Sequence, residues 1–240
     1  MRSILTNVKP MRLLLFDVFG TLVDRRASLI ELAAATGAVA GVQADWAAVI
    51  DDWRRAYQPA MDRVRGGAAW RDLDSLQRET LGDVLARHAV RLPDASRESL
   101  VLGWRQLRPW PDCRAGLERL RRVHLVATLS NGHVALLADL LKFADLRVDA
   151  VLSAQLAGSY KPDPKVYRTA LELLECRPED AGMVAAHGSD LRAAAALGLR
   201  PIFIRRPLEW GDGSQAASPP ALDGLVDADG LDDLASLLGC

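Results

Sequence analysis

The sequence predicts an α/β fold, in which a parallel sheet covered by helices on both faces is interrupted by a helical insert. Short apolar runs alternate with segments of helical period near the start of the chain and through its second half, a pattern typical of parallel sheets. Between about residues 24 and 108, only helical spacing of apolar residues is found. The chain has 240 residues, enough for one domain that carries an insert and for a core of its own.

The predicted strands are short apolar runs, and the clearest two end at polar residues. The first covers 12–16 and is followed by Asp17 and the turn FGT, and another covers 125–129 and is followed by Ser130 and Asn131. Ligands of parallel sheets bind outside the carboxyl ends of the strands, so we expect a site there. Weaker strand candidates are 150–153, 183–186 and 201–204.

The insert is predicted from apolar residues at helical spacing in 46–61, 73–85 and 100–104. The segment Pro109-Trp110-Pro111-Asp112 marks the return to the sheet, because proline is tolerated at a helix start but not inside a helix. We expect residues 24–108 to form a cap over the carboxyl edge of the sheet, and residues 1–23 and 109–240 to form the core.

The helices of the core are predicted from the same spacing, and one long loop is expected near the end of the chain. The loop runs from Pro207 to Pro220, and we expect it to be flexible. A last short helix follows it. The helical segments are 117–120, 136–141, 166–174, 191–197 and 231–238.

Composition excludes several classes of function. Thirty basic and 31 acidic residues give a formal net charge of −1, so nucleic acid and anionic membranes are not expected partners. No run approaches 18 apolar residues, and the first residues lack the apolar stretch of a secretory signal. The cysteines, Cys113, Cys176 and Cys240, are too few and too scattered for a disulfide framework or a zinc site. We therefore expect reduced thiols and a cytoplasmic location.

Asp17, in the segment DVFGTL, is the first candidate for chemistry. A carboxylate on a tight turn after a strand can act as a nucleophile, although it can also simply accept turn N–H groups. Lys161 and Asp190 follow later elements, and a lysine that meets two carboxylates holds one of them ionised. At ~4 Å and an effective dielectric near 20, one such pairing is about 4 kcal/mol. Taken singly, Lys161 could equally be a solvated residue at a helix start, and Ser130-Asn131 a helix N-cap.

The motifs DVFGTL, LSNG, KPDPKVY and AAHGSDLRAA resemble those of the haloacid dehalogenase superfamily and, within it, the L-2-haloacid (type II) dehalogenases. The resemblance extends from Leu13 to the C-terminal helix. It implies a Rossmann-like core with an inserted helical cap, and hydrolysis of short 2-haloacids through an ester on Asp17. The implied ligands are the 2-haloacid and its halide, with no metal and no cofactor. Whether the chain forms a homodimer is left open.

The resemblance also implies roles for individual residues. Asp17 would attack the carbon that bears the halogen, Lys161 would neutralise Asp17, and Tyr167 would support the lysine. Asp190 would orient the lysine or help to prepare the water that hydrolyses the ester. Arg54, in the segment WRRAY, would receive the halide. The remaining implied contacts are Thr21 and Ser130 to Asp17 or the substrate carboxylate, Asn131 to the halide, and Val18 and Phe19 to the substrate.

Two departures from the superfamily's phosphatases favour cleavage of a carbon–halogen bond. Phe19 stands where those enzymes have a general acid, and Ala186 where they tend to have a magnesium-binding Asp. A halide leaves without protonation, and Mg²⁺ requires more oxygen ligands than Asp17 and Asp190 supply. A magnesium-dependent phosphatase of small metabolites stays an alternative. So do a hydrolase of another small electrophile, such as a fluoroacid or a strained ring, and a non-catalytic binding module on this fold.

Two further departures separate the chain from the better-known bacterial dehalogenases. Ala185 and His187 stand where those enzymes have Ser-x-Asn, and Ser189 stands where they have Trp. We hypothesise that His187 is a neutral imidazole that accepts the proton of the hydrolytic water, with a pKa near 6.5 if its surroundings do not perturb it. The alternative is a histidine whose nitrogens are satisfied by local backbone. Ser189 would leave the pocket wall smaller and more polar.

Overall fold

The computed structural model describes residues 11–211 and 217–240. Residues 1–10, nearly all of the leading segment that lacks the pattern of a secretory signal, lie outside this range. Residues 212–216, in the middle of the loop expected between Pro207 and Pro220, also lie outside it. Within the described residues, no helix combines the length and the apolar character needed to cross a membrane.

A six-stranded parallel sheet forms the core of the molecule, in the order β5-β4-β1-β6-β7-β8. The predicted α/β class with a parallel sheet is confirmed, and every predicted strand is present. β8 was not predicted, because its three residues carry a central aspartate and form no apolar run. The strands are β1 (Leu13–Phe16), β4 (Leu125–Ser130), β5 (Ala150–Ser153), β6 (Ala181–Ala185), β7 (Arg200–Ile204) and β8 (Val226–Ala228).

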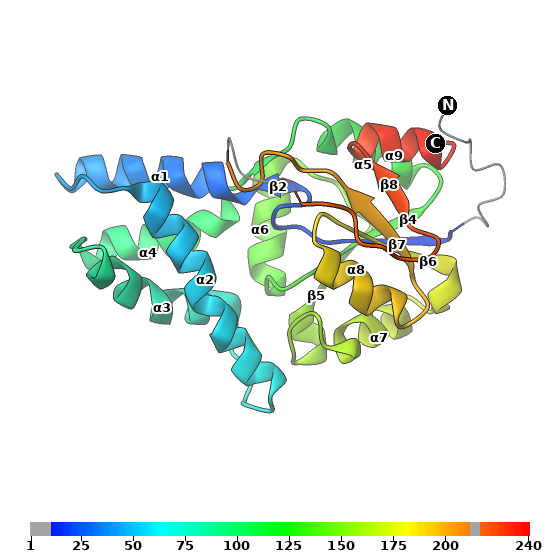
Figure 1. Cartoon of the computed structure of the whole chain (residues 1–240), viewed down its shortest axis with the longest axis horizontal. Helices are drawn as coiled ribbons and strands as arrows, with labels where there is room; N and C mark the ends of the chain where they lie inside the picture. The colour runs from blue at the N-terminus through cyan, green and yellow to red at the C-terminus, as the bar shows by residue number, and fades with distance from the viewer. Residues whose placement is uncertain (1–10, 212–216) are drawn as a thin grey trace.

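Helices cover both faces of this sheet, and for that reason all four residues of β1 are buried. Figure 1 shows α5 and α9 on one side of the sheet and α7 and α8 on the other. α7 is capped by Asp163, whose carboxylate accepts the backbone N–H of Lys165, and the helix begins at Pro164. The helices are α5 (Cys113–Arg121), α6 (Val134–Ala144), α7 (Pro164–Leu173), α8 (Gly188–Ala195) and α9 (Leu231–Leu237), with short 3-10 turns η2 (Ala154–Ala157) and η3 (Pro178–Asp180).

The inserted segment is helical and stands beside the sheet domain (Figure 1). Its two ends meet in an antiparallel ribbon of β2 (Val23–Asp24) and β3 (Arg108–Pro109). α1 was not predicted, because its alanine-rich sequence has a weak apolar stripe; it is started by Asp24, which accepts the N–H of Ala27. The helices are α1 (Arg25–Val39), α2 (Trp46–Arg65), α3 (Leu73–Arg87) and α4 (Asp94–Leu102), followed by the 3-10 turn η1 (Gly103–Arg105).

An aromatic cluster joins the cap to the core beneath the expected site. The ring of Trp104, in η1, is met edge-on by Trp53 and Tyr57 of α2 at centroid distances of 5.8 and 5.6 Å. On the core side it is met by Phe19 at 5.3 Å. Each such pair contributes about 0.5–1.5 kcal/mol beyond its buried area. Phe19 is therefore anchored to the cap, and its ring forms one wall of the space above β1.

Candidate active site

Three charged side chains converge at the carboxyl ends of β1 and β6. The Lys161 ammonium donates to Asp17 Oδ1 at 2.9 Å and to Asp190 Oδ2 at 2.6 Å, and all three side chains are buried. Burial alone would lower the pKa of Lys161, but the two carboxylates raise it above its ordinary value. Parallel strands bring these residues together although Asp17 and Lys161 are 144 positions apart.

Asp17 is an ionised carboxylate. Burial alone would raise its pKa, but the Lys161 charge and a hydrogen bond from His187 hold it well below the ordinary value. Burial instead raises the pKa of Asp190. Thr21 donates its hydroxyl to Asp17 Oδ2 at 2.9 Å and accepts the backbone N–H of Ala186 at 3.0 Å. Asp17 is thus held in position by the hydroxyl of Thr21 and is negatively charged, which are the two requirements of a carboxylate nucleophile.

His187 lies between two carboxylates, and this corrects both sequence-based interpretations of it. Its Nδ1–H donates to Asp17 Oδ2 at 3.0 Å and its Nε2–H to Glu209 Oε1 at 2.7 Å. Burial alone would lower the pKa of His187, but hydrogen bonds to Asp17 and Glu209 and their charges raise it to about 9. At neutral pH it is an imidazolium whose partners are side chains, so it is neither a neutral base in the free protein nor a histidine satisfied by backbone.

Glu209 was missed by the sequence analysis, which treated its segment as a loop. Its side chain is only 2% exposed, and Oε2 has no hydrogen-bond partner within the part of the chain that is described. Gly20, with φ at +86°, makes room for it: a Cβ there would lie 2.4 Å from Glu209 Oε1. The glycine of the FGT turn therefore allows the close approach of a carboxylate to the histidine that contacts Asp17.

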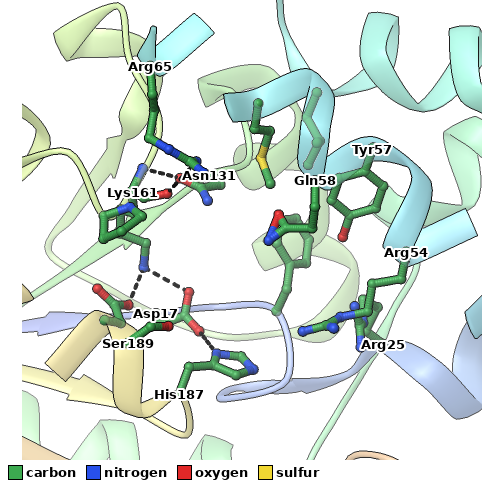
Figure 2. Close-up of a pocket in the computed structure, with 15 residues that line it drawn as sticks. Asp17, Arg25, Arg54, Tyr57, Gln58, Arg65, Asn131, Lys161, His187 and Ser189 are labelled. Carbon is green, nitrogen blue, oxygen red and sulfur yellow. Dashed lines mark hydrogen bonds and ion pairs between the residues drawn. The ribbon is translucent and has the colours of Figure 1, made fainter. Parts of the chain in front are cut away.

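A cavity of about 170 Å³ opens between the core and the cap above Asp17. Figure 2 shows the core residues Asp17, Lys161 and His187 on one side and Arg54, Arg25 and Tyr57 on the other. Asn131 Oδ1 accepts the backbone N–H of Lys161 at 2.7 Å, so its amide NH₂ is the group left for a ligand. The remaining lining residues are Phe19, Gln58, Met61, Arg65, Leu73, Pro162, Ser189 and Asp190.

Four residues implied as contacts or supports do not line this cavity. Val18 is fully buried in the hydrophobic core, so its side chain is not a substrate contact. Ser130 is also fully buried, and its hydroxyl accepts the N–H of Gly132 at 3.4 Å rather than holding Asp17. Tyr167 donates to Asp190 Oδ1 and supports Lys161 only through that carboxylate. Thr21 donates to Asp17 from the side that faces away from the cavity.

The residues around Asp17 do not fit a magnesium ion. The Lys161 ammonium already occupies the space between Asp17 and Asp190, and Phe19 and Ala186 bring no carboxylate. Throughout the described ranges, no three His, Cys, Asp or Glu side chains form a group that could hold a metal ion. An ammonium bound to both carboxylates supplies the positive charge that a divalent cation would otherwise bring.

Comparison with known proteins relates the chain to a family of hydrolases. Residues 11–198 match the family model of haloacid dehalogenase-like hydrolases. The sequence is 29% identical over 203 residues to (S)-2-haloacid dehalogenase 4A of Burkholderia cepacia, covering 83% of this chain and 85% of that protein. The crystal structure of an L-2-haloacid dehalogenase is 44% identical, with a TM-score of 0.89 over 95% of this chain and 99% of its own. That of a defluorinating L-2-haloacid dehalogenase is 34% identical, with a TM-score of 0.91 over 96% of each chain.

Proposed function

This chain belongs to the haloacid dehalogenase-like hydrolase family, and on that premise we propose that it hydrolyses short 2-haloacids to 2-hydroxy acids and halide. The observation that carries the proposal is the state of Asp17: a buried carboxylate kept ionised by Lys161, with Phe19 where a general acid would be needed for a phosphate ester. A halide requires no proton in order to leave, so the absent acid is no defect for this reaction.

The first step of the proposed reaction uses Asp17 as nucleophile. One Oδ atom attacks the carbon that bears the halogen, the carbon–halogen bond breaks, and its electron pair leaves with the halide. In-line displacement sends the halide away from Asp17, toward the cap side of the cavity where Arg54 lies. The product of this step is an ester between Asp17 and the 2-hydroxy acid.

The second step is hydrolysis of that ester, and His187 becomes able to assist once the ester has formed. An ester on Asp17 is neutral, so one of the two carboxylate charges that keep His187 protonated is lost and the pKa of the imidazole falls. Nε2–H keeps its hydrogen bond to Glu209. Nδ1, once its proton has passed to solvent, accepts a proton from the water that adds to the Asp17 carbonyl. When the ester bond breaks, the second proton of that water passes to the leaving alkoxide oxygen, which releases the 2-hydroxy acid and restores the Asp17 carboxylate; His187 is again an imidazolium.

Halide release from a panel of 2-haloacids tests the function directly. The panel contains 2-chloro-, 2-bromo- and 2-fluoropropionate in both enantiomers, the fluoro compound because one similar structure is that of a defluorinating enzyme. We expect halide release from at least the chloro and bromo acids, unchanged by a chelator, and no release of phosphate from phosphoserine or sugar phosphates. Magnesium-dependent phosphate release without halide release would instead establish the phosphatase alternative.

We also propose residues 24–108 as the cap domain, bounded by the β2–β3 ribbon that pairs Val23 with Pro109. The cytoplasmic location stays a prediction that rests on the three free cysteines. Homodimer formation is to be decided by the mass of the protein in solution.

A further inference from the structure

Arg25, the first residue of α1, is a buried cation that the proposed mechanism does not use. It is only 5% exposed, and it lines the cavity above Asp17. Among residues 11–211 and 217–240, its guanidinium has neither a hydrogen bond nor an ion pair. Arg26, the next residue, donates to both oxygens of Asp51 at 2.9 and 3.0 Å. A guanidinium is rarely buried without an anion. The unpaired state of Arg25 therefore indicates that its guanidinium binds an anionic ligand.

Arg54 lies beside Arg25 and has the same lack of a carboxylate partner within the described residues. The ring of Trp210 lies against both: Arg54 Cζ is 4.0 Å from the ring centroid and Arg25 Cζ is 5.6 Å from it. Burial, and after it the charge of Arg25, lower the pKa of Arg54. Figure 2 shows the two guanidinium groups together across the cavity from Asp17. Two like charges on one buried wall repel each other unless an anion lies between them.

The charges around the cavity balance only if both arginines are counted. His187 is paired with Glu209, and Arg65 with Asp62. Three cations then remain, Lys161, Arg25 and Arg54, against the carboxylates of Asp17 and Asp190. The excess positive charge matches the carboxylate of one substrate. When Asp17 becomes a neutral ester, the positive charge that its carboxylate had balanced is left without a partner. The departing halide neutralises that charge. Without Arg25, the site with substrate bound would hold an uncompensated negative charge both before and after the first step.

The family resemblance already implies that Arg54 receives the halide; we propose that Arg25, which lies with Arg54 against Trp210, is a second halide-binding residue, with the leaving halide between the two guanidinium groups. The inference rests on the proposed function. It follows from in-line geometry, because the halide must leave on the side opposite Asp17, where both guanidiniums lie. In this step the carbon–halogen electron pair goes to the halide and no proton moves. Trp210 is a positioning residue, since its ring face attracts both cations without consuming their N–H donors.

The test compares Arg25→Gln with Arg26→Gln, a matched control whose guanidinium contacts Asp51 and does not line the cavity. The first step is measured as the single-turnover rate of halide release in rapid quench, with the protein in excess over 2-bromo- or 2-chloropropionate. For Arg25→Gln we expect this rate to be about tenfold lower with the bromo acid, and the loss to be larger with the chloro acid, whose leaving group is poorer and needs more stabilisation. Inhibition by added bromide should weaken by about the same factor. Arg26→Gln should change neither quantity.

Two results would overturn the inference while leaving the proposed function intact. One is an unchanged single-turnover rate of halide release in Arg25→Gln. The other is a rise in KM that is equal for both halogens, which would assign Arg25 to the substrate carboxylate. Crystals of the unaltered protein soaked in bromide give a readout independent of activity and of the folding of any variant. We expect an anomalous peak in contact with both guanidiniums, and a peak at Arg54 alone refutes the site. Absence of halide release from every 2-haloacid, in contrast, counts against the proposed function itself.

Discussion

Replacing Glu209 with glutamine tests how His187 is used. The structure gives His187 two acceptors, and together they raise its pKa from 6.5 to about 9. At 1.36 kcal/mol per pKa unit, the preference for the imidazolium is about 3 kcal/mol. If the two carboxylates contribute equally, Glu209 accounts for about half of this preference for the imidazolium. That half is still present when Asp17 is an ester. The amide in Glu209→Gln would keep an acceptor for Nε2–H but lose the charge, so we expect ester hydrolysis to slow by about tenfold.

The first step should not slow in Glu209→Gln, because Asp17 keeps Lys161 as its ammonium partner. Ester then accumulates, and halide is released in a burst followed by slow turnover. Rapid-quench measurement of halide and intact-protein mass spectrometry of the ester detect both features. A double variant with His187→Gln should be no slower than His187→Gln alone, because Glu209 acts through the histidine. Linear halide release with no ester, or equal slowing of both steps, would refute the role assigned to this pair.

Two further predictions concern Arg54 and the folded-state pKa of His187. Arg54→Ala should slow halide release by about a hundredfold, because a preorganised guanidinium that receives the halide supplies roughly 3 kcal/mol. Arg55→Ala should change little, since Arg55 is exposed on α2 and pairs with Asp52. Equal, small losses would show that the wrong arginine was chosen. Because the pKa of His187 is raised on folding, its contribution to stability is complete below pH 6.5 and is lost as pH rises through about 9. Urea unfolding between pH 6.5 and 9.5 should show a steeper loss for the wild type than for His187→Gln, and identical slopes would contradict the assignment.

The cluster of Asp17, Lys161 and Asp190 could be predicted because its parts follow elements of a parallel sheet. Once the strands that precede Asp17 and Asp190 are assigned, the carboxyl edge of the sheet brings both residues to one place, and the helix start after Lys161 adds the cation. The strand pattern and the helical insert could be predicted for the same reason: burial on both faces leaves continuous apolar runs, and amphipathic helices leave a regular spacing.

The parts that could not be predicted depend on contacts without a local sequence signal. Glu209 and Trp210 lie in a segment with no periodicity, and nothing in its sequence indicates that it folds back onto His187 and the arginines. The charge state of His187 follows in part from that same contact, because hydrogen bonds to Asp17 and Glu209 raise the pKa of the imidazole from its unperturbed 6.5 to about 9. Ser130 is the last residue of β4 and Val18 lies just after β1, yet both side chains are fully buried and do not line the cavity, which a motif does not specify.

The central claim is that an ester forms on Asp17, and oxygen labelling tests it most directly. The protein, in excess over 2-chloropropionate, completes a single turnover in ¹⁸O-water. Because water adds to the aspartyl carbonyl, we predict that one ¹⁸O enters the peptide that contains Asp17 and that the first-turnover 2-hydroxy acid is unlabelled. The Asp17→Asn variant should show neither label in this peptide nor release of halide. Label in the product of the first turnover, with none in the protein, would show that water attacks the substrate directly and would contradict the ester mechanism.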